Sequence, residues 1–137
     1  MGALSAAASL QLPVRMRGIQ LGRPVDILLD LHTWHVLGFV VLCGDESRRF
    51  LPYAACQAQP TEIAVGSALM LLEDVGFYEE RGTSFRSLLD GTVQGGTLRD
   101  VLIGPGGAVT QLELERDGTI ARVQAAGLMV VPTRAAA

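Results

Sequence analysis

The chain has 137 residues, of which 49% are hydrophobic, and its 11 basic and 14 acidic residues leave a net charge of −3. This length suits one ordinary domain, or two very small ones that share an interface. The apolar runs are all shorter than the roughly 18 residues of a membrane-spanning helix, and the scattered charges form no basic face of the kind that binds phosphates. We therefore expect no membrane span and no direct binding of nucleic acid.

Residues 1–16 predict a flexible leader. Residues 1–9 are rich in alanine and serine, and no basic residue precedes their apolar part. A secretory signal places its positive charges first, so this order of residues favours a cytoplasmic protein.

The first structured segment has the pattern of a β-hairpin. Residues 25–30 and 36–42 are apolar runs, and the short polar stretch 31–35 between them predicts a turn. Residues 49–51 then predict a third strand, which ends at Pro52 because proline has no amide donor for the ladder.

The next segment combines a polar stretch with an apolar one. Residues 53–61 contain Pro60 and predict at most one helical turn. Residues 64–72 are almost continuously apolar and predict a buried strand. Residues 74–87 gather charges, glycines and aromatic side chains, which predicts a linker between two halves of the chain.

The order of elements then begins again. Residues 96–103 align with residues 22–29, with Asp100 on Asp26 and three aliphatic residues after each aspartate. Repetition of an order of elements is evidence for repeated architecture. The chain is accordingly divided into a leader (1–16), a first repeat (17–73), a linker (74–87), a second, shorter repeat (88–132) and a tail (133–137).

The residues of the first repeat resemble the PRC-barrel family. The resemblance rests on Gly22-Arg23-Pro24-Val25-Asp26 with its following aliphatic residues, on Val36-Leu37-Gly38-Phe39-Val40-Val41, and on Phe50-Leu51-Pro52. The second repeat keeps the opening and return strands but has Ala121-Arg122-Val123 in place of the Leu-Pro strand end. We therefore expect an all-β fold, a small PRC-type β-barrel in two tandem copies with short helical turns only.

The resemblance implies a binding function and no shared catalytic residues. The family includes the barrels of the photosynthetic reaction centre H subunit and of a ribosome maturation factor. We expect a non-enzymatic module that binds another protein or assembly, with a homodimer as one form. A ribosome-assembly accessory that binds a ribosomal protein, and a barrel that binds a small ligand or metal, are the alternatives.

A metal site would have to involve Asp30, His32 and His35, which lie in or beside the first turn. Three ligands from so short a turn meet one ion only if the loop folds inward, and a fourth ligand must come from elsewhere. We expect a polar turn with Trp34 packed over the barrel, and no metal.

The remaining reactive residues do not form a recognisable active site. Cys43 and Cys56 lack the spacing of a zinc site or a disulfide framework, so we expect two buried free thiols. The glycine clusters lack the lysine of a phosphate-binding loop. We expect no catalytic residue and no cofactor.

Aromatic residues in polar segments are the candidate binding residues. Aromatic and arginine side chains are enriched as anchors of protein interfaces. Packing between the two repeats is the competing interpretation for the aromatic residues. The candidates are Trp34 in the first turn, with Phe77, Tyr78, Arg81, Phe85 and Arg86 in the linker.

Overall fold

The computed structural model describes residues 4–132, and the tail at 133–137 lies outside the described residues, as do residues 1–3. The fold is mostly β, as predicted. The strands are β1 (Leu4–Ser5), β2 (Val14–Met16), β3 (Ile19–Asp30), β4 (His35–Cys43), β5 (Arg48–Pro52), β6 (Cys56–Ala58), β7 (Ile63–Val65), β8 (Thr83–Ser84), β9 (Thr92–Val93), β10 (Gly96–Ile103), β11 (Val109–Arg116) and β12 (Thr119–Gln124). The helices are α1 (Ala6–Ser9), α2 (Val75–Arg81) and α3 (Phe85–Leu88), with 3-10 turns η1 (Tyr53–Ala55), η2 (Ala68–Met70) and η3 (Pro105–Gly107).

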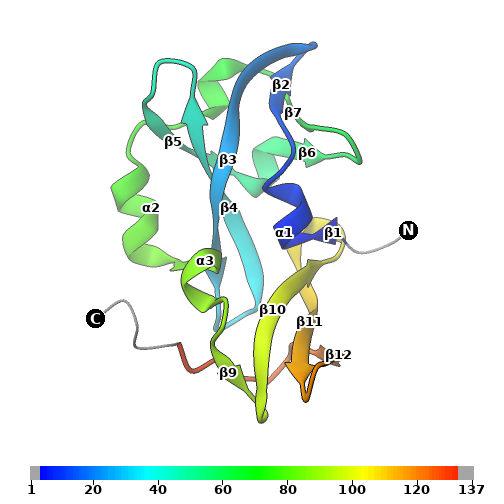
Figure 1. Cartoon of the computed structure of the whole chain (residues 1–137). Helices are drawn as coiled ribbons and strands as arrows, with labels where there is room; N and C mark the ends of the chain where they lie inside the picture. The colour runs from blue at the N-terminus through cyan, green and yellow to red at the C-terminus, as the bar shows by residue number, and fades with distance from the viewer. Residues whose placement is uncertain (1–3, 133–137) are drawn as a thin grey trace.

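The strands form two sheets (Figure 1). The larger sheet has the order β5-β4-β3-β2-β7-β6, with β8 added to β3, and the smaller has the order β1-β10-β11-β12, with β9 added to β10. A bridge between His35 and Ala108 joins the sheets, and the Val109 N–H donates to the Trp34 carbonyl oxygen at 2.7 Å. The larger of two hydrophobic clusters contains residues from both halves of the chain, and the smaller one is formed by Leu28, Val40 and Phe50.

The long strands β3 and β10 share several features. Both pair with the next strand as an antiparallel hairpin, and both shift register beside an aspartate, at Asp26 in β3 and Asp100 in β10. Both follow tight turns whose central residues have positive φ, as type I′ hairpins require. The turns are Arg17-Gly18 (φ 52° and 83°) and Gln94-Gly95 (φ 48° and 76°).

Each aspartate holds a short strand and helix that come from the other half of the chain. Asp100 accepts hydrogen bonds from the Ser5 hydroxyl and from the Ala7 N–H (3.0 Å), while β1 pairs with β10. Asp26 accepts hydrogen bonds from the Ser84 hydroxyl and from the Arg86 N–H (3.1 Å), while β8 pairs with β3. The two halves are therefore interlocked.

The leader prediction is wrong for residues 4–16. Ala6 and Ser9 are fully buried, and the Ser9 hydroxyl donates to the Ala6 carbonyl oxygen at 2.7 Å. Ser5 caps α1 by accepting the Ala8 N–H at 3.0 Å. Small side chains let α1 approach β10 closely, so the same composition that indicated disorder in the sequence supports tight packing in the structure.

The segment predicted as a linker carries α2, β8 and α3. Asp74 caps α2 by accepting the Phe77 N–H at 3.3 Å. The Tyr78 ring stacks on Phe50 with 4.0 Å between centroids, and Arg48 pairs with Glu79 at 2.9 Å. These contacts pack α2 against β5, so this segment covers one edge of the larger sheet. At seven residues, α2 is also longer than the short helical turns expected from the sequence.

The prediction of a buried strand over residues 64–72 is also wrong. The strand β7 ends at Val65, and the chain turns at Gly66 and Ser67 into η2. Ser67 accepts the Leu69 N–H at 3.1 Å, which starts the 3-10 turn. As a result Leu69 and Met70 reach the surface, whereas Val65 and Leu71 on either side of them belong to the core.

Candidate protein-binding surface

The aromatic residues singled out in the sequence lie in different environments. Trp34 is buried in the first turn at φ 51°, and its indole N–H donates to the Leu128 carbonyl oxygen at 3.3 Å. Phe85 is fully buried in the core. Tyr78 is half-buried against Phe50. The structure therefore packs three of the four candidate aromatic side chains against the protein itself.

Phe77 and Arg81 form the exposed part of that set. Phe77 is 43% exposed, and the Arg81 guanidinium lies 3.5 Å from its ring centroid. Arg81 also donates to the Phe77 carbonyl oxygen at 2.8 Å. Arg86 is exposed and donates through Nε to the Val25 carbonyl oxygen. Phe77 and Arg81 therefore form a small aromatic and cationic patch on α2, and Arg86 lies apart from them on α3.

The most exposed large apolar side chain of the described residues belongs to η2. Leu69 is 85% exposed and the adjacent Met70 is 41% exposed. The turn holds them firmly, because the Met70 N–H donates to the Ser67 carbonyl oxygen and the Leu71 N–H to that of Ala68, both at 3.1 Å. We call Leu69 and Met70 the η2 knuckle. It presents a leucine to solvent on a fixed backbone.

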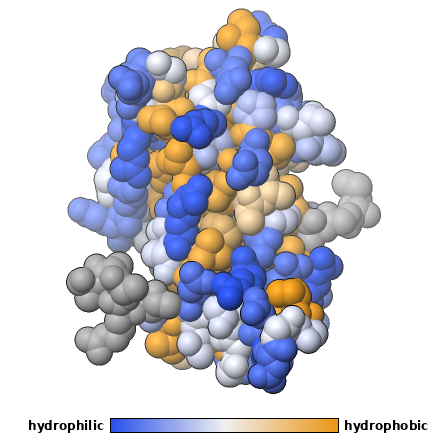
Figure 2. All heavy atoms as spheres, in the orientation of Figure 1, coloured by the Kyte–Doolittle hydropathy of each residue, from blue (hydrophilic) through white to orange (hydrophobic). Residues whose placement is uncertain are grey.

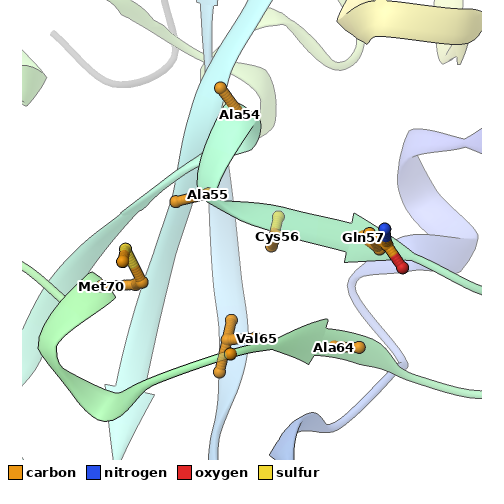
Figure 3. A pocket seen from close by; sticks show the side chains of 8 residues that line it. Ala54, Ala55, Cys56, Gln57, Ala64, Val65 and Met70 are labelled. Atoms are coloured by element: carbon orange, nitrogen blue, oxygen red, sulfur yellow. The ribbon is translucent and has the colours of Figure 1, made fainter.

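A hollow of about 500 Å³ adjoins the knuckle. In Figure 3, Met70 stands at one end of the hollow on the same side as Ala55, and Ala64 and Val65 line the side that β7 forms. The lining contains no charged residue and consists of Ala54, Ala55, Cys56, Gln57, Ala64, Val65, Gly66 and Met70. Because most of these side chains are small, the hollow can receive a bulky apolar group from another molecule.

Cys56 in this hollow is poorly suited to nucleophilic catalysis. Its thiol donates to the Tyr53 carbonyl oxygen at 3.4 Å, and burial raises the pKa of Cys56 to about 11. The thiol is thus protonated at neutral pH, whereas nucleophilic cysteines act as thiolates. Cys43 is also a free thiol whose pKa is raised by burial. Both are only half-buried, which is less burial than the sequence indicated.

The turn that holds Asp30, His32 and His35 makes local hydrogen bonds. Asp30 accepts the His32 N–H at 2.9 Å, and this bond lowers the pKa of the Asp30 carboxyl. Nδ1 of His35 lies 3.3 Å from the Thr33 carbonyl oxygen. Within residues 4–132, no group of three or more histidine, cysteine or carboxylate side chains is arranged to hold a metal ion.

A second, smaller hollow lies beside this turn. It has a volume of about 300 Å³ and a mostly apolar lining made by Leu31, His32, Trp34, Leu128, Met129 and Val130. Met129 stands at its rim and is strongly exposed. The sequence placed a candidate binding residue here, at Trp34, but the chain segment that completes the hollow comes from the other half and could not be identified from local pattern.

Apolar residues also reach the surface elsewhere. Figure 2 shows an uneven band of apolar residues down the middle of one face, with hydrophilic residues on both sides of it. Among the described residues, no helix has the length and hydrophobicity needed to cross a membrane.

The chain has no match among protein-family models or among curated protein sequences.

Proposed function

We propose that this chain is a non-enzymatic protein-binding module that contacts its partner through the η2 knuckle and the adjoining hollow. The observation that carries the proposal is the exposure of Leu69 on a fixed turn beside an uncharged hollow. An exposed leucine on an ordered backbone loses little conformational freedom on binding, so its burial contributes favourably to affinity. A hollow beside it offers a complementary position for an apolar side chain of the partner.

The chemistry of the surface favours a protein partner over a charged ligand. Leu69 and Met70 supply apolar area, and the thioether of Met70 adapts its shape to what it contacts. Gln57 is the polar side chain of the lining and can orient a hydrogen bond. The expected partner surface is apolar, with at least one side chain that enters the hollow.

We further propose that the architecture is a pair of PRC-barrel-type units. Three observations support this: the shared register shifts at Asp26 and Asp100, the equivalent turns that precede β3 and β10, and the matching hydrogen bonds to Ser5 and Ser84. Under this proposal the chain is a cytoplasmic assembly module, and the interlocking of the units makes it one body.

Affinity purification from the native host tests the binding proposal. The wild-type chain is compared with Leu69→Asp and with the control Ile19→Asp, which places the same charge at another exposed apolar residue (60% exposed), at the start of β3. We expect a specific protein to be recovered with wild type and Ile19→Asp, and at least tenfold less of it with Leu69→Asp. Circular dichroism and urea unfolding should be unchanged, because Leu69 packs little against the fold.

A Phe77→Ser variant separates this surface from the patch on α2. If Phe77→Ser no longer recovers the partner while Leu69→Asp still does, the binding surface lies on α2 and not at the η2 knuckle. Equal recovery with all variants, or recovery of no specific protein by wild type, would overturn the proposal.

A further inference from the structure

The strand β12 forms an edge of the smaller sheet. It pairs only with β11, in one unbroken register from Arg116 opposite Thr119 to Gln111 opposite Gln124. The Ala125 N–H donates to the Thr110 carbonyl oxygen at 3.1 Å, so Ala125 directs its backbone groups towards β11. Successive residues of a strand direct their backbone groups alternately to its two sides. The backbone groups of Ile120, Arg122 and Gln124 therefore face away from β11, where residues 4–132 supply no neighbouring strand.

The first half of the chain shows how the corresponding edge is covered. The strand β5 pairs with β4 as β12 pairs with β11, and Phe50 is its central outward-facing residue. Phe50 exchanges both backbone hydrogen bonds with Leu72, each at 2.8 Å. Tyr78 of α2 then stacks on the Phe50 ring. Within the described residues, β12 has neither cover.

The edge of β12 also lacks the features that usually prevent strand addition. Edge strands are commonly protected by bulges, proline or lysine. The register of β12 is unbroken, and residues 119–124 contain neither proline nor lysine. The charge of Arg122 is engaged by Glu113 at 2.9 Å, and Ile120 is 52% exposed.

We propose that a second copy of this chain pairs with β12 antiparallel through its own β12. A twofold axis makes such an edge self-complementary. Charge selects the register, because centring the pair on Arg122 would place two arginines opposite each other, which is unfavourable. Centring it on Ala121 places Ile120 opposite Arg122 of the second copy and Thr119 opposite Val123, and it overlaps almost the whole strand.

This interface is separate from the η2 knuckle and does not depend on the binding function proposed there. A single pair of short strands buries less than the roughly 800 Å² per partner of a standard interface, so the dimer should dissociate in the micromolar range or above. The two smaller sheets then form one continuous sheet across the axis.

Disulfide trapping tests the pairing and its register. Ala121→Cys is made in the full chain with Cys43→Ser and Cys56→Ser, and Val123→Cys in the same background is the matched control. On the axis, two Cα atoms of a non-hydrogen-bonded pair lie about 4.5 Å apart, within disulfide range. The two copies of residue 123 would lie about 13 Å apart, at four residue steps along the strands. Copper phenanthroline supplies the oxidant.

We expect a covalent dimer from Ala121→Cys, in at least tenfold excess over that from Val123→Cys. Analytical ultracentrifugation should show a concentration-dependent dimer for wild type. The dimer should be lost in Ile120→Pro, because proline removes an amide that faces outward and leaves the ladder to β11 intact. It should be retained in the control Ile120→Thr. Preferential trapping at residue 123 would overturn the register. A monomer at all concentrations, or equal association of both Ile120 variants, would overturn the interface.

Discussion

The sharpest prediction about the fold concerns the hydrogen bonds of Ser5 to Asp100 and of Ser84 to Asp26. Asp100 accepts three hydrogen bonds, from Ser5, from the Ala7 N–H and from the Val101 N–H at 2.7 Å. Hydrogen bonds to a charged group contribute about 1.5–3 kcal/mol each, and they are not additive. Ala7 is exposed and regains water when the carboxylate is removed, so we expect Asp100→Ala to lower the free energy of unfolding by about 2–4 kcal/mol. Ser5→Ala should cost about 1–2 kcal/mol, since it also removes the cap of α1.

A double-mutant cycle measured by urea unfolding shows which pairs are in contact. The Ser5→Ala and Asp100→Ala variants should couple by about 1–2 kcal/mol, as should Ser84→Ala with Asp26→Ala. Ser5→Ala with Asp26→Ala is the matched control and should be additive within about 0.5 kcal/mol. Coupling of Ser5 to Asp26 in place of Asp100, or additivity in every pair, would refute the interlocked arrangement.

Three further predictions concern single residues. Gly38→Ala should lower the free energy of unfolding by at least about 2 kcal/mol in urea titrations, because the added Cβ would press on the Leu51 carbonyl oxygen and lie 2.6 Å from the Phe50 ring; an unchanged midpoint would contradict the close packing of β4 and β5. In a Cys43→Ser background, alkylation of Cys56 should remain slow at pH 8 and accelerate only towards its pKa of about 11, and fast alkylation at pH 7 would contradict its burial. Arg81→Ala should cost less than about 1 kcal/mol by thermal unfolding, since its contact with Phe77 is exposed to water; a larger loss would mean that the pair supports the fold of α2.

The local part of the fold could be predicted from the sequence. Alternating or continuous apolar runs bounded by turn residues indicated the β3–β4 and β10–β11 hairpins, and Pro52 marked the end of β5. The alignment of Asp100 with Asp26 identified two residues with equivalent partners in the structure, since each accepts a hydrogen bond from a serine hydroxyl, Ser5 and Ser84 respectively. These features depend on residues close together in sequence, which is why pattern alone identifies them.

The contacts between distant segments could not be predicted in this way. The alanines of α1 indicate either disorder or close packing, and only the hydrogen bonds of Ser5 and Ala7 to Asp100 decide between them. For Phe85 the polar neighbours left two interpretations open, an anchor of a protein interface or packing between the repeats, and in the structure α3 turns its side chain into the core. Burial of a side chain in a short helix depends on the element it packs against.

The candidate surface at η2 was missed because hydrophobicity outweighed turn signals. Residues 64–72 are apolar enough to indicate a core strand, whereas Gly66 and Ser67 are the residues that break it. A glycine followed by a serine able to cap the next turn was the available signal. Its consequence, an exposed Leu69, is visible only once the path of the chain is known.

Site-specific photocrosslinking at residue 69 shows whether the η2 knuckle contacts a partner protein. A photoreactive phenylalanine analogue replaces Leu69 in one variant and Ile19 in another, and both are irradiated in the native host before denaturing purification. We expect a discrete adduct with a different protein from position 69 and none of that adduct from position 19. The absence of an adduct at position 69, or the same pattern of adducts at both positions, would contradict this expectation.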